Sequence, residues 1–368
     1  MAKKEYYYEA VLKNMMENIE SGVYQYGQLL PPERDLAEQY QVNRTTIRKA
    51  LELLTEDGYI VKRQGSGNRV VYQKDGWQSA EPAEDIPHSE EKMIGFFIPG
   101  GKDGDYRLEQ PFYMNLYYYV ELGCRGEKCR VVCITVTDLE DFKSVLKQYR
   151  FAGICFMAMI KSDIVACARE NQIPVVTVNG RFPNTVCVTM DNVNGGYLAV
   201  KYLLEKGHRK ISYIVGPENY FTSQDRMLGA IKACNEIGLL PEKEQIVAGD
   251  WTFSGGYQAM QEILARPKEM WPTAVFAFNE EMSYGAMKAI SEHYLKVPED
   301  ISLIGFDNAL DVAYAKEVTT IDGNIEQVAR VLVRTLMNAI DGKGMDSAAT
   351  IVLPVRLLEH GSVKDLTE

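Results

Sequence analysis

The stretch LPPERDLAEQYQVNRTTIRKALELLTEDGYIVKRQGSGNRVV, residues 30–71, decides the fold of the first part of the chain. Pro31-Pro32 opens a short helix, and a second helix with apolar residues at helical spacing begins after Asn43, a good N-cap. Residues 59–71 hold two short alternating segments around a glycine-containing turn, which indicates a hairpin. Two helices followed by a two-stranded wing form an arrangement that can place one helix in the major groove of DNA.

The second helix of this stretch has two chemically different faces. Its apolar positions, which we expect to point inward, are Ile47, Ala50, Leu51 and Leu54. The opposite face carries Arg44, Thr45, Arg48 and Lys49. Two arginines four residues apart lie on one side of a helix and can reach phosphates and guanine edges together. The alternative for this face alone is an ordinary solvated helix surface.

Taken as a whole, the strings LPPERDLAEQYQVNRTTIRKAL and GYIVKRQGSGNRVV resemble the winged helix-turn-helix of the GntR family of bacterial regulators, over residues 6–72. The family commonly has serine where Asn43 stands, and asparagine can also cap a helix. The resemblance implies operator contacts from the helices and minor-groove contacts from the glycine turn. The expected DNA-binding residues are Arg34, Arg44, Thr45, Thr46, Arg48, Lys49, Gln64 and Gly65.

Length and composition limit the possible classes of protein. A chain of 368 residues is long enough for two or three domains. No apolar run reaches about 18 residues, so no membrane span is expected. The first residues lack the apolar core of a secretory signal, which favours the cytoplasm. The seven cysteines are odd in number and lack paired metal-ligand spacing, so we expect buried free thiols, no metal site and no cofactor.

The charge is unevenly distributed along the chain. The net charge is −11, but residues 1–72 carry 10 basic and 10 acidic side chains, and all of the excess lies in residues 73–368. Within 41–72 there are 6 basic and 3 acidic residues, which provides the local basic surface that DNA binding needs. Residues 73–92 are acidic and proline-containing, as in a connector. We therefore expect a DNA-binding domain over 1–72, a linker over 73–92 and an effector-binding and dimerisation domain over 93–368.

From residue 93 onward, short apolar runs alternate with helical patterns. The runs lie at 93–99, 130–136, 152–158, 174–179, 187–191, 211–216, 245–250, 274–279 and 301–306. Strands that alternate with helices form parallel βαβ units with helices on both faces of the sheet. This many strands favours two lobes over one sheet. The fold class is therefore α/β, with a winged helix-turn-helix in front of two lobes of parallel sheet.

Polar and aromatic residues follow several of these strands, where ligands bind in open parallel sheets. They are Phe112, Tyr113, Asp191, Trp251, Asn279 and Asp307. Carboxylates and amides bind sugar hydroxyls, and an aromatic ring packs on the apolar face of a sugar, so the set favours a neutral polyhydroxylated ligand. A G-x-G-x-x-G turn or a P-loop is absent from the sequence, which argues against a dinucleotide. Singly, an Asp or Asn after a strand is more often a helix N-cap, and a tryptophan such as Trp251 is more often a core residue.

The segments DNVNGGYLAVKYLLEKGHRKISYIVGP, GDWTFSGGYQAM, PTAVFAFNEEMSYGAM and VPEDISLIGFDN resemble the effector-binding core of the LacI/GalR family, over about 93–363. The resemblance implies a two-lobed, periplasmic-binding-protein-like fold with crossovers near Gly207, Ile321 and Leu353. It also implies that the effector cleft is lined by Asp191, Arg226, Trp251, Asn279 and Asp307. The sequence departs from the family at Gly323, where Gln or His is frequent, and at Asn179-Gly180-Arg181, where Asp-Arg is usual.

These features together predict a homodimeric repressor that binds double-stranded operator DNA and responds to a small sugar. The combination of a GntR-like and a LacI-like domain resembles that of arabinose repressors, which makes L-arabinose the first effector to expect. A different sugar or sugar acid, or a sugar-binding transport module, are the alternatives. An enzyme is disfavoured, because the four histidines form no recognisable nucleophile–base pair. The sequence leaves open whether the effector releases or promotes DNA binding.

Overall fold

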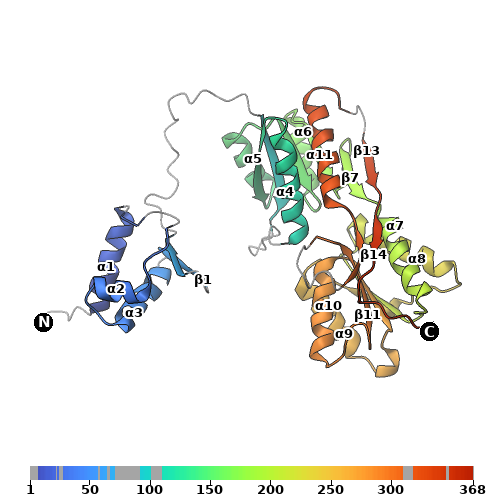
Figure 1. Cartoon of the computed structure of the whole chain (residues 1–368). Helices are drawn as coiled ribbons and strands as arrows, with labels where there is room; N and C mark the ends of the chain where they lie inside the picture. Colours follow the sequence, from blue (N-terminus) through green and yellow to red (C-terminus); the bar gives the residue numbers. More distant parts are fainter. Residues whose placement is uncertain are drawn as a thin grey trace. The chain divides into compact units, whose positions relative to one another are not determined.

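The structure is a computed structural model that describes residues 7–21, 23–24, 28–56, 59–63, 67–70, 92–100, 110–309, 318–344 and 348–367. The chain divides into two compact units, Met1–Ser89 and Glu90–Glu368 (Figure 1). The linker expected over 73–92 lies almost wholly outside the described residues, so the domain boundaries at 72 and 92 stay predictions.

The first unit is a small helical domain with a two-stranded wing. Its elements are α1 (Tyr7–Glu20), α2 (Glu33–Gln39), α3 (Arg44–Glu56), β1 (Ile60–Arg63) and β2 (Gly67–Val70). The four α3 positions expected to point inward are all buried, which confirms the orientation of this helix. They pack with Val11, Met15 and Ile19 of α1 and with Leu36 of α2. Asn43 caps α3 as predicted, because its side-chain oxygen accepts the Thr46 N–H at 2.8 Å.

The wing is an antiparallel pair that begins where Ile60 pairs with Val70 and ends where Arg63 pairs with Gly67. Leu29 bridges to Arg69 on the other side of β2, so the chain before α2 also contacts this wing. Ile60 and Val70 are buried and attach the base of the wing to the helices. The tip of the wing, residues 64–66, lies outside the described residues.

The second unit contains two parallel-dominated sheets, each of six strands among the described residues (Figure 1). The sheet of the first lobe has the order β13-β7-β6-β5-β3-β4, and that of the second lobe β14-β12-β11-β10-β8-β9. The strands of the first lobe are β3 (Lys92–Pro99), β4 (Cys129–Val136), β5 (Gly153–Met157), β6 (Val175–Val178), β7 (Val186–Met190) and β13 (Ala349–Leu353). Those of the second lobe are β8 (Ile211–Val215), β9 (Ile246–Ala248), β10 (Ala274–Ala277), β11 (Ser302–Asp307), β12 (Thr319–Asp322) and β14 (Arg356–Leu358).

Helices cover both sheets. The helices that pack on the first lobe are α4 (Pro111–Arg125), α5 (Leu139–Gln148), α6 (Ser162–Glu170) and α11 (Ile325–Ile340). The second lobe has α7 (Asn192–Glu205), α8 (Phe221–Asn235), α9 (Phe253–Leu264) and α10 (Glu280–Glu292), with 3-10 turns at Lys243–Gln245 and Lys268–Met270. All nine apolar runs expected from the sequence form strands. The strands β12, β13 and β14 were not predicted from the sequence.

The chain crosses between the lobes at three places, one of which differs from the expectation. The first crossover lies at Asp191, between β7 of the first lobe and α7, which packs on strands of the second. The expectation near Gly207 was therefore wrong: Gly207 follows α7 inside the second lobe, where its φ of +86° lets the chain turn into β8. The other two crossovers, after β12 and after β13, agree with those expected near Ile321 and Leu353.

All seven cysteines, each within the described residues, are free thiols, and six of them are buried, as expected. Burial raises the pKa of Cys124 to about 12 and that of Cys133 to about 11, so these thiols stay protonated and unreactive at neutral pH. Among the described residues, no helix is both long enough and apolar enough to cross a membrane.

Glycines allow α7 and α8 to touch backbone to backbone. A Cβ on Gly229 would overlap the Val193 carbonyl oxygen, and a Cβ on Gly196 would overlap the Arg226 carbonyl oxygen. Gly256 and Gly285 play the same part between α9 and α10, against Met282 and Phe253. These contacts fix the helices of the second lobe beside the site described below.

We expect Gly229→Ala to lower the free energy of unfolding by about 1–3 kcal/mol, because α7 and α8 must move apart to make room for the new methyl group. Gly126→Ala is the matched control, since Gly126 has φ −65° and its Cβ would lie 3.6 Å from the Gly123 carbonyl oxygen. It should be neutral or slightly stabilising. Urea unfolding of the three proteins measures this, and equal midpoints for all three would contradict the packing argument.

Candidate functional site

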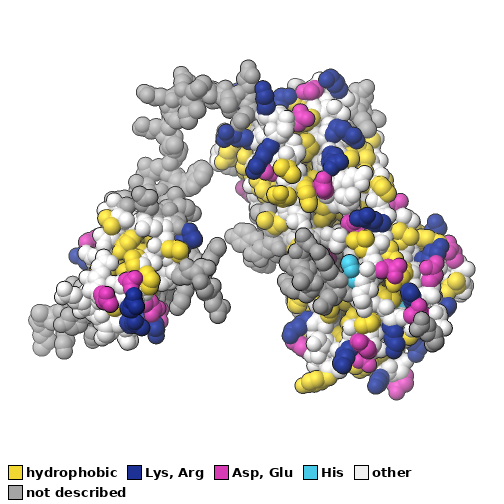
Figure 2. Space-filling model, viewed as in Figure 1, with side chains coloured by type: hydrophobic (Ala, Val, Ile, Leu, Met, Phe, Trp, Pro, Cys, Tyr) yellow, Lys and Arg dark blue, Asp and Glu magenta, His cyan; other side chains and the backbone are white. Residues whose placement is uncertain are grey.

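The candidate DNA-binding face is the exposed side of α3. Arg44, Thr45, Arg48 and Lys49 are exposed, and Thr46 is half-buried with its hydroxyl bonded to Asn43. Figure 2 shows dark blue Lys and Arg side chains, with acidic ones beside them, at the end of the first unit where Figure 1 places α3. Gln64 and Gly65, the expected contacts of the wing, lie outside the described residues.

Ion pairs hold several of these cations in place. Arg48 pairs with Glu33 at 3.0 Å, Arg34 with Asp35 at 3.2 Å, and Lys49 with Glu52 at 3.5 Å. All three pairs are largely exposed, and such pairs contribute only about 0–1 kcal/mol. Contacts this weak can be exchanged for phosphate contacts at little cost. The face is therefore basic and accessible, and its cations can exchange their carboxylate partners for phosphates.

A cavity lies between the lobes of the second unit and contains about 560 Å³ of space free of protein atoms, its open mouth included. Six of the seven residues expected to bind an effector line it: Phe112, Tyr113, Arg226, Trp251, Asn279 and Asp307. The other lining residues were not predicted from the sequence as effector contacts: Gln110, Met157, Ala158, Met159, Val178, Asn179, Tyr220 and Thr222. Most of the lining residues follow the carboxyl ends of strands in both sheets.

Asp191 is not among the residues that line the cavity. Its carboxylate accepts the Asn194 N–H at 2.9 Å and caps α7 at the crossover. The next residue, Asn192, is 2% exposed and turns toward Arg226. Two adjacent polar residues after a strand point in different directions, and the sequence does not show which of them contacts Arg226.

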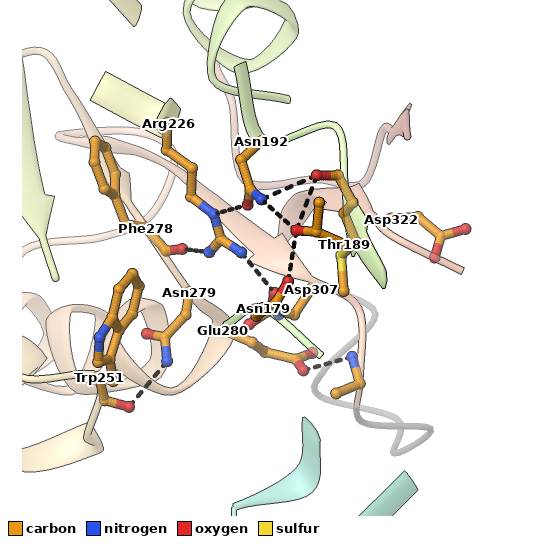
Figure 3. Close-up of polar contacts among 12 residues, drawn as sticks. Asn179, Thr189, Asn192, Arg226, Trp251, Phe278, Asn279, Glu280, Asp307 and Asp322 are labelled. Atoms are coloured by element: carbon orange, nitrogen blue, oxygen red, sulfur yellow. Dashed lines mark hydrogen bonds and ion pairs between the residues drawn. The ribbon is translucent and has the colours of Figure 1, made fainter. Parts of the chain in front are cut away.

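Arg226 on α8 is the centre of the polar network shown in Figure 3. Its Nε donates to Asn192 Oδ1 at 2.9 Å, one terminal nitrogen donates to the Phe278 carbonyl oxygen, and the other pairs with Asp307 at 3.3 Å. The guanidinium also lies 3.5 Å from the centre of the Phe306 ring. Several segments of the second lobe therefore converge on one buried cation.

The network continues into the first lobe. The Asn192 amide donates to Thr189 Oγ1 at 3.2 Å, and that hydroxyl donates to Asn179 Oδ1 at 2.7 Å (Figure 3). Thr189 lies at the end of β7 and Asn179 directly after β6, both in the first lobe. Because Asn179 also lines the cavity, a continuous row of hydrogen bonds joins the cavity walls of the two lobes. Asn179 belongs to the motif that departs from the family pattern.

Trp251 and Asn279 form a second fixed pair. The Asn279 amide donates to the Trp251 carbonyl oxygen at 2.9 Å, while its Oδ1 caps α10 by accepting the Met282 N–H at 3.0 Å. Trp251 has φ +72°, which is rare for an aromatic residue and is a strained conformation typical of functional sites. Its ring lies so close to Gly216 that no Cβ would fit there. The indole is therefore held against the cavity by its neighbours.

The charges of the cavity favour a neutral ligand. Arg226 and Asp307 are both more than nine-tenths buried, and their opposite charges form an ion pair. Burial raises the pKa of Asp307, and the nearby guanidinium opposes that rise. A phosphate would bring its own negative charge beside this carboxylate. Amides, hydroxyls and aromatic rings make up most of the remaining polar and ring surface.

Gly323 has no side chain that could contact a ligand, and it is not among the residues that line the cavity. A Cβ at this position would overlap the sulfur of Met190. The side chain of Met190 occupies the space that a larger residue at position 323 would need.

Comparison with known proteins matches the two units to different families. Residues 7–70 match the model of bacterial regulatory proteins of the gntR family, and residues 200–363 match a periplasmic binding protein-like domain. An HTH-type transcriptional repressor PurR from Shigella dysenteriae serotype 1 is 35% identical over 342 residues, which cover 90% of this chain and 96% of that protein.

Solved structures agree on the fold. A LacI family transcriptional regulator from Enterococcus faecalis V583 with bound ribose has a TM-score of 0.64 and 26% identity, covering 75% of this chain and 100% of that one. The lac repressor dimer bound to operator and the anti-inducer ONPF has a TM-score of 0.63 at 21% identity, with 75% and 96% covered. At this identity the second likeness concerns the fold alone.

Arg226→Leu should lower the free energy of unfolding at pH 7 by about 3–5 kcal/mol, because it leaves the Asp307 carboxylate buried without its partner. An acid whose folded-state pKa is raised binds more protons when folded, so its penalty is greatest above that pKa and falls as the pH drops. The loss should therefore shrink as the pH is lowered toward the pKa of the unpaired carboxyl. Adding Asp307→Asn to Arg226→Leu is the control and should remove the pH dependence of the difference. A pH-independent loss in the single variant would contradict this account.

Proposed function

Because this chain belongs to the family of HTH-type transcriptional repressors with a LacI-type core, here joined to a GntR-family DNA-binding domain, we propose that it represses carbohydrate-utilisation genes and that a small sugar releases it from its operator. The observation that carries this proposal is the cavity between the lobes, in which six of the expected effector contacts meet. As a DNA-binding repressor it acts in the cytoplasm, and its partner there is double-stranded operator DNA.

The exposed face of α3 supports operator binding. Arg44 and Arg48 lie on one face with Thr45 and Lys49, and the apolar side of the helix fixes its orientation. Among the described residues Arg44 makes no ion pair, so it is available for a base edge or a phosphate. Gln64 and Gly65 in the wing, and Arg34 and Thr46 in the helices, complete the proposed contact set. Phosphate contacts give affinity and position, while guanine contacts give sequence preference.

The chemistry of the cavity supports a neutral sugar as effector. Asn279, Asn179 and Asp307 offer acceptors and donors to hydroxyl groups, and Trp251, Phe112 and Tyr113 offer ring faces. We place L-arabinose first, since the pairing of domains resembles the arabinose repressor AraR. The related regulator from Enterococcus faecalis binds ribose, another pentose. A different sugar or a sugar acid is the alternative.

Contacts between the lobes provide a route for the signal. Asn115 of the first lobe donates to the Ala309 carbonyl oxygen of the second, and Arg181 pairs with Asp225 across the lobes at 3.0 Å. A ligand that binds one relative pose of the lobes better than another shifts the population toward that pose. By linkage, operator DNA must weaken sugar binding by the same factor by which sugar weakens DNA binding.

An exposed apolar stripe on α4 supports a homodimer. Met114, Tyr118 and Leu122 are 48%, 57% and 50% exposed and lie four residues apart, on one face of the helix. The opposite face buries Leu116, Val120 and Cys124 in the first lobe. Contiguous exposed apolar groups mark protein–protein contacts. A two-fold dimer also places two winged domains on the two half-sites of a pseudo-palindromic operator.

Arg48→Ala should weaken binding to an operator duplex about tenfold or more, because a bidentate guanine contact contributes about 1–3 kcal/mol. Sugar affinity measured by calorimetry should be unchanged. Lys13→Ala, which removes an exposed charge from α1, is the matched control. The duplex would be selected from a random pool by the purified protein, and affinities measured by fluorescence anisotropy. Equal affinities of the Arg48 variant and the wild type would remove α3 from the proposed interface.

Tyr118→Glu should shift the protein from dimer toward monomer at micromolar concentration, because it places a charge in an apolar contact that must be desolvated. Tyr294→Glu is the control, since Tyr294 is 96% exposed and lies on the second lobe after α10. Sedimentation equilibrium measures both. A Tyr118 variant that stays as dimeric as the control would place the dimer interface elsewhere.

A further inference from the structure

The first lobe has a groove at the edge of its sheet opposite the effector cavity. It lies beside the amino-terminal ends of β6 and β7 and beside the last turn of α11. Its charged lining residues are Arg169, Arg334 and Lys343, all of them exposed, and no Asp or Glu is among the described residues that line it. Within the described part of the chain, none of the three forms an ion pair. In a protein of net charge −11, such a surface is unexpected.

The second lobe has a groove at the corresponding position, and the charges of the two grooves can be compared. It too lies at the amino-terminal ends of its strands, beside β8, β9 and β10, and near the carboxyl ends of helices. Its lining holds three basic residues, Arg209, Lys210 and Arg266, and three acidic ones, Glu242, Glu244 and Glu269. Helix dipoles favour cations at both edges equally. They therefore do not explain why the described lining of the first groove has three cations and no acid, while that of the second has three of each.

The basic groove lies beside the point where the second unit begins. Lys92, at the start of β3, pairs with Asp341 at 3.1 Å, and Asp341 is two residues before Lys343. Further along the same edge, Lys128 and Arg130 lie at the start of β4, and Arg150 precedes β5. Figure 2 shows dark blue side chains outnumbering magenta ones toward the end of this lobe where α11 ends in Figure 1.

We propose that this basic groove, formed by Arg169, Arg334 and Lys343, binds the phosphate backbone of the DNA that flanks the sequence read by the winged domain. The inference rests on the proposed function, since it needs a protein that is already held on DNA. The 22 Cα-to-Cα steps from Val70 to Lys92 can span at most about 70–80 Å when fully extended. DNA held by the first unit is therefore present near the groove at high effective concentration, and a weak contact suffices.

Duplex DNA is a better occupant than the acidic segment of this chain. Residues 73–92 carry six acidic side chains in twenty residues. A duplex presents one charge per about 1.7 Å of its axis, and each neutralised phosphate also releases counterions. The groove has arginines, which bind phosphate oxygens with two parallel hydrogen bonds. It also has exposed asparagine side chains beside them, Asn184 and Asn338, which can donate to the same backbone.

The test compares salt dependence on two duplexes. Both duplexes contain the sequence selected by the purified full-length protein. The short duplex ends at the edges of that sequence, and the long duplex extends about 10 base pairs beyond each edge. The groove variant combines Arg169→Gln, Arg334→Gln and Lys343→Gln. The matched control combines Lys210→Gln, Lys243→Gln and Lys268→Gln, which removes the same charge from exposed positions of the second lobe. Anisotropy titrations at several salt concentrations give the slope of log K against log salt.

On the long duplex the groove variant should lose about 0.9 units of slope for each phosphate contact, or about 2–3 units in all for one protomer's groove, while the control matches the wild type. On the short duplex all three proteins should agree. Equal slopes for the groove variant and the control on the long duplex would overturn the proposal and leave the proposed function intact. Tighter DNA binding by the groove variant would also overturn it, and would assign the groove to the acidic segment. Failure of the wild type to select any duplex would instead contradict the proposed function.

Discussion

A buried guanidinium cannot lose its charge, and the second unit is built around one. Arg226 is 4% exposed and keeps its proton at any physiological pH, so the protein must supply acceptors on every side of it. They come from Asn192 at the crossover, from the backbone after β10 and from Asp307 at the end of β11. Desolvating such a pair costs several kcal/mol per ion, so it contributes little net stability. What it fixes is position: a shift of any of these segments leaves a buried charge without a partner.

This constraint links ligand chemistry to movement. The cation and its carboxylate both line the cavity, and the hydrogen bonds from Asn192 through Thr189 reach Asn179 in the other lobe. In the proposed mechanism, a sugar hydroxyl that bonds to Arg226 or Asn179 would compete with the hydrogen bonds of this row, and this competition would couple sugar binding to the relative pose of the lobes. Couplings of this kind are typically about 1–3 kcal/mol, or about 5- to 150-fold in affinity. That is enough to switch a gene regulator whose DNA contacts lie in another domain.

The sequence predicted those features that depend on local pattern. Apolar runs located nine strands, helical spacing identified the buried side of α3, and Asn43 was recognised as its cap. It did not distinguish Asp191 from Asn192, because either could cap α7, and only the tertiary position of Arg226 decides between them. Thr189 and Asn179 were missed as partners because their contacts join different strands. β14 was missed because it is three residues long and pairs antiparallel at a sheet edge, where the pattern is weakest.

The central claim is that one ligand site and one DNA site share a single coupling free energy. The most direct measurement is calorimetric titration of L-arabinose into the full-length protein, alone and saturated with the selected operator duplex, together with anisotropy titration of that duplex with and without the sugar. The account predicts that sugar weakens DNA binding and that DNA weakens sugar binding by the same factor, as linkage requires. Sugar binding that leaves operator affinity unchanged would contradict it.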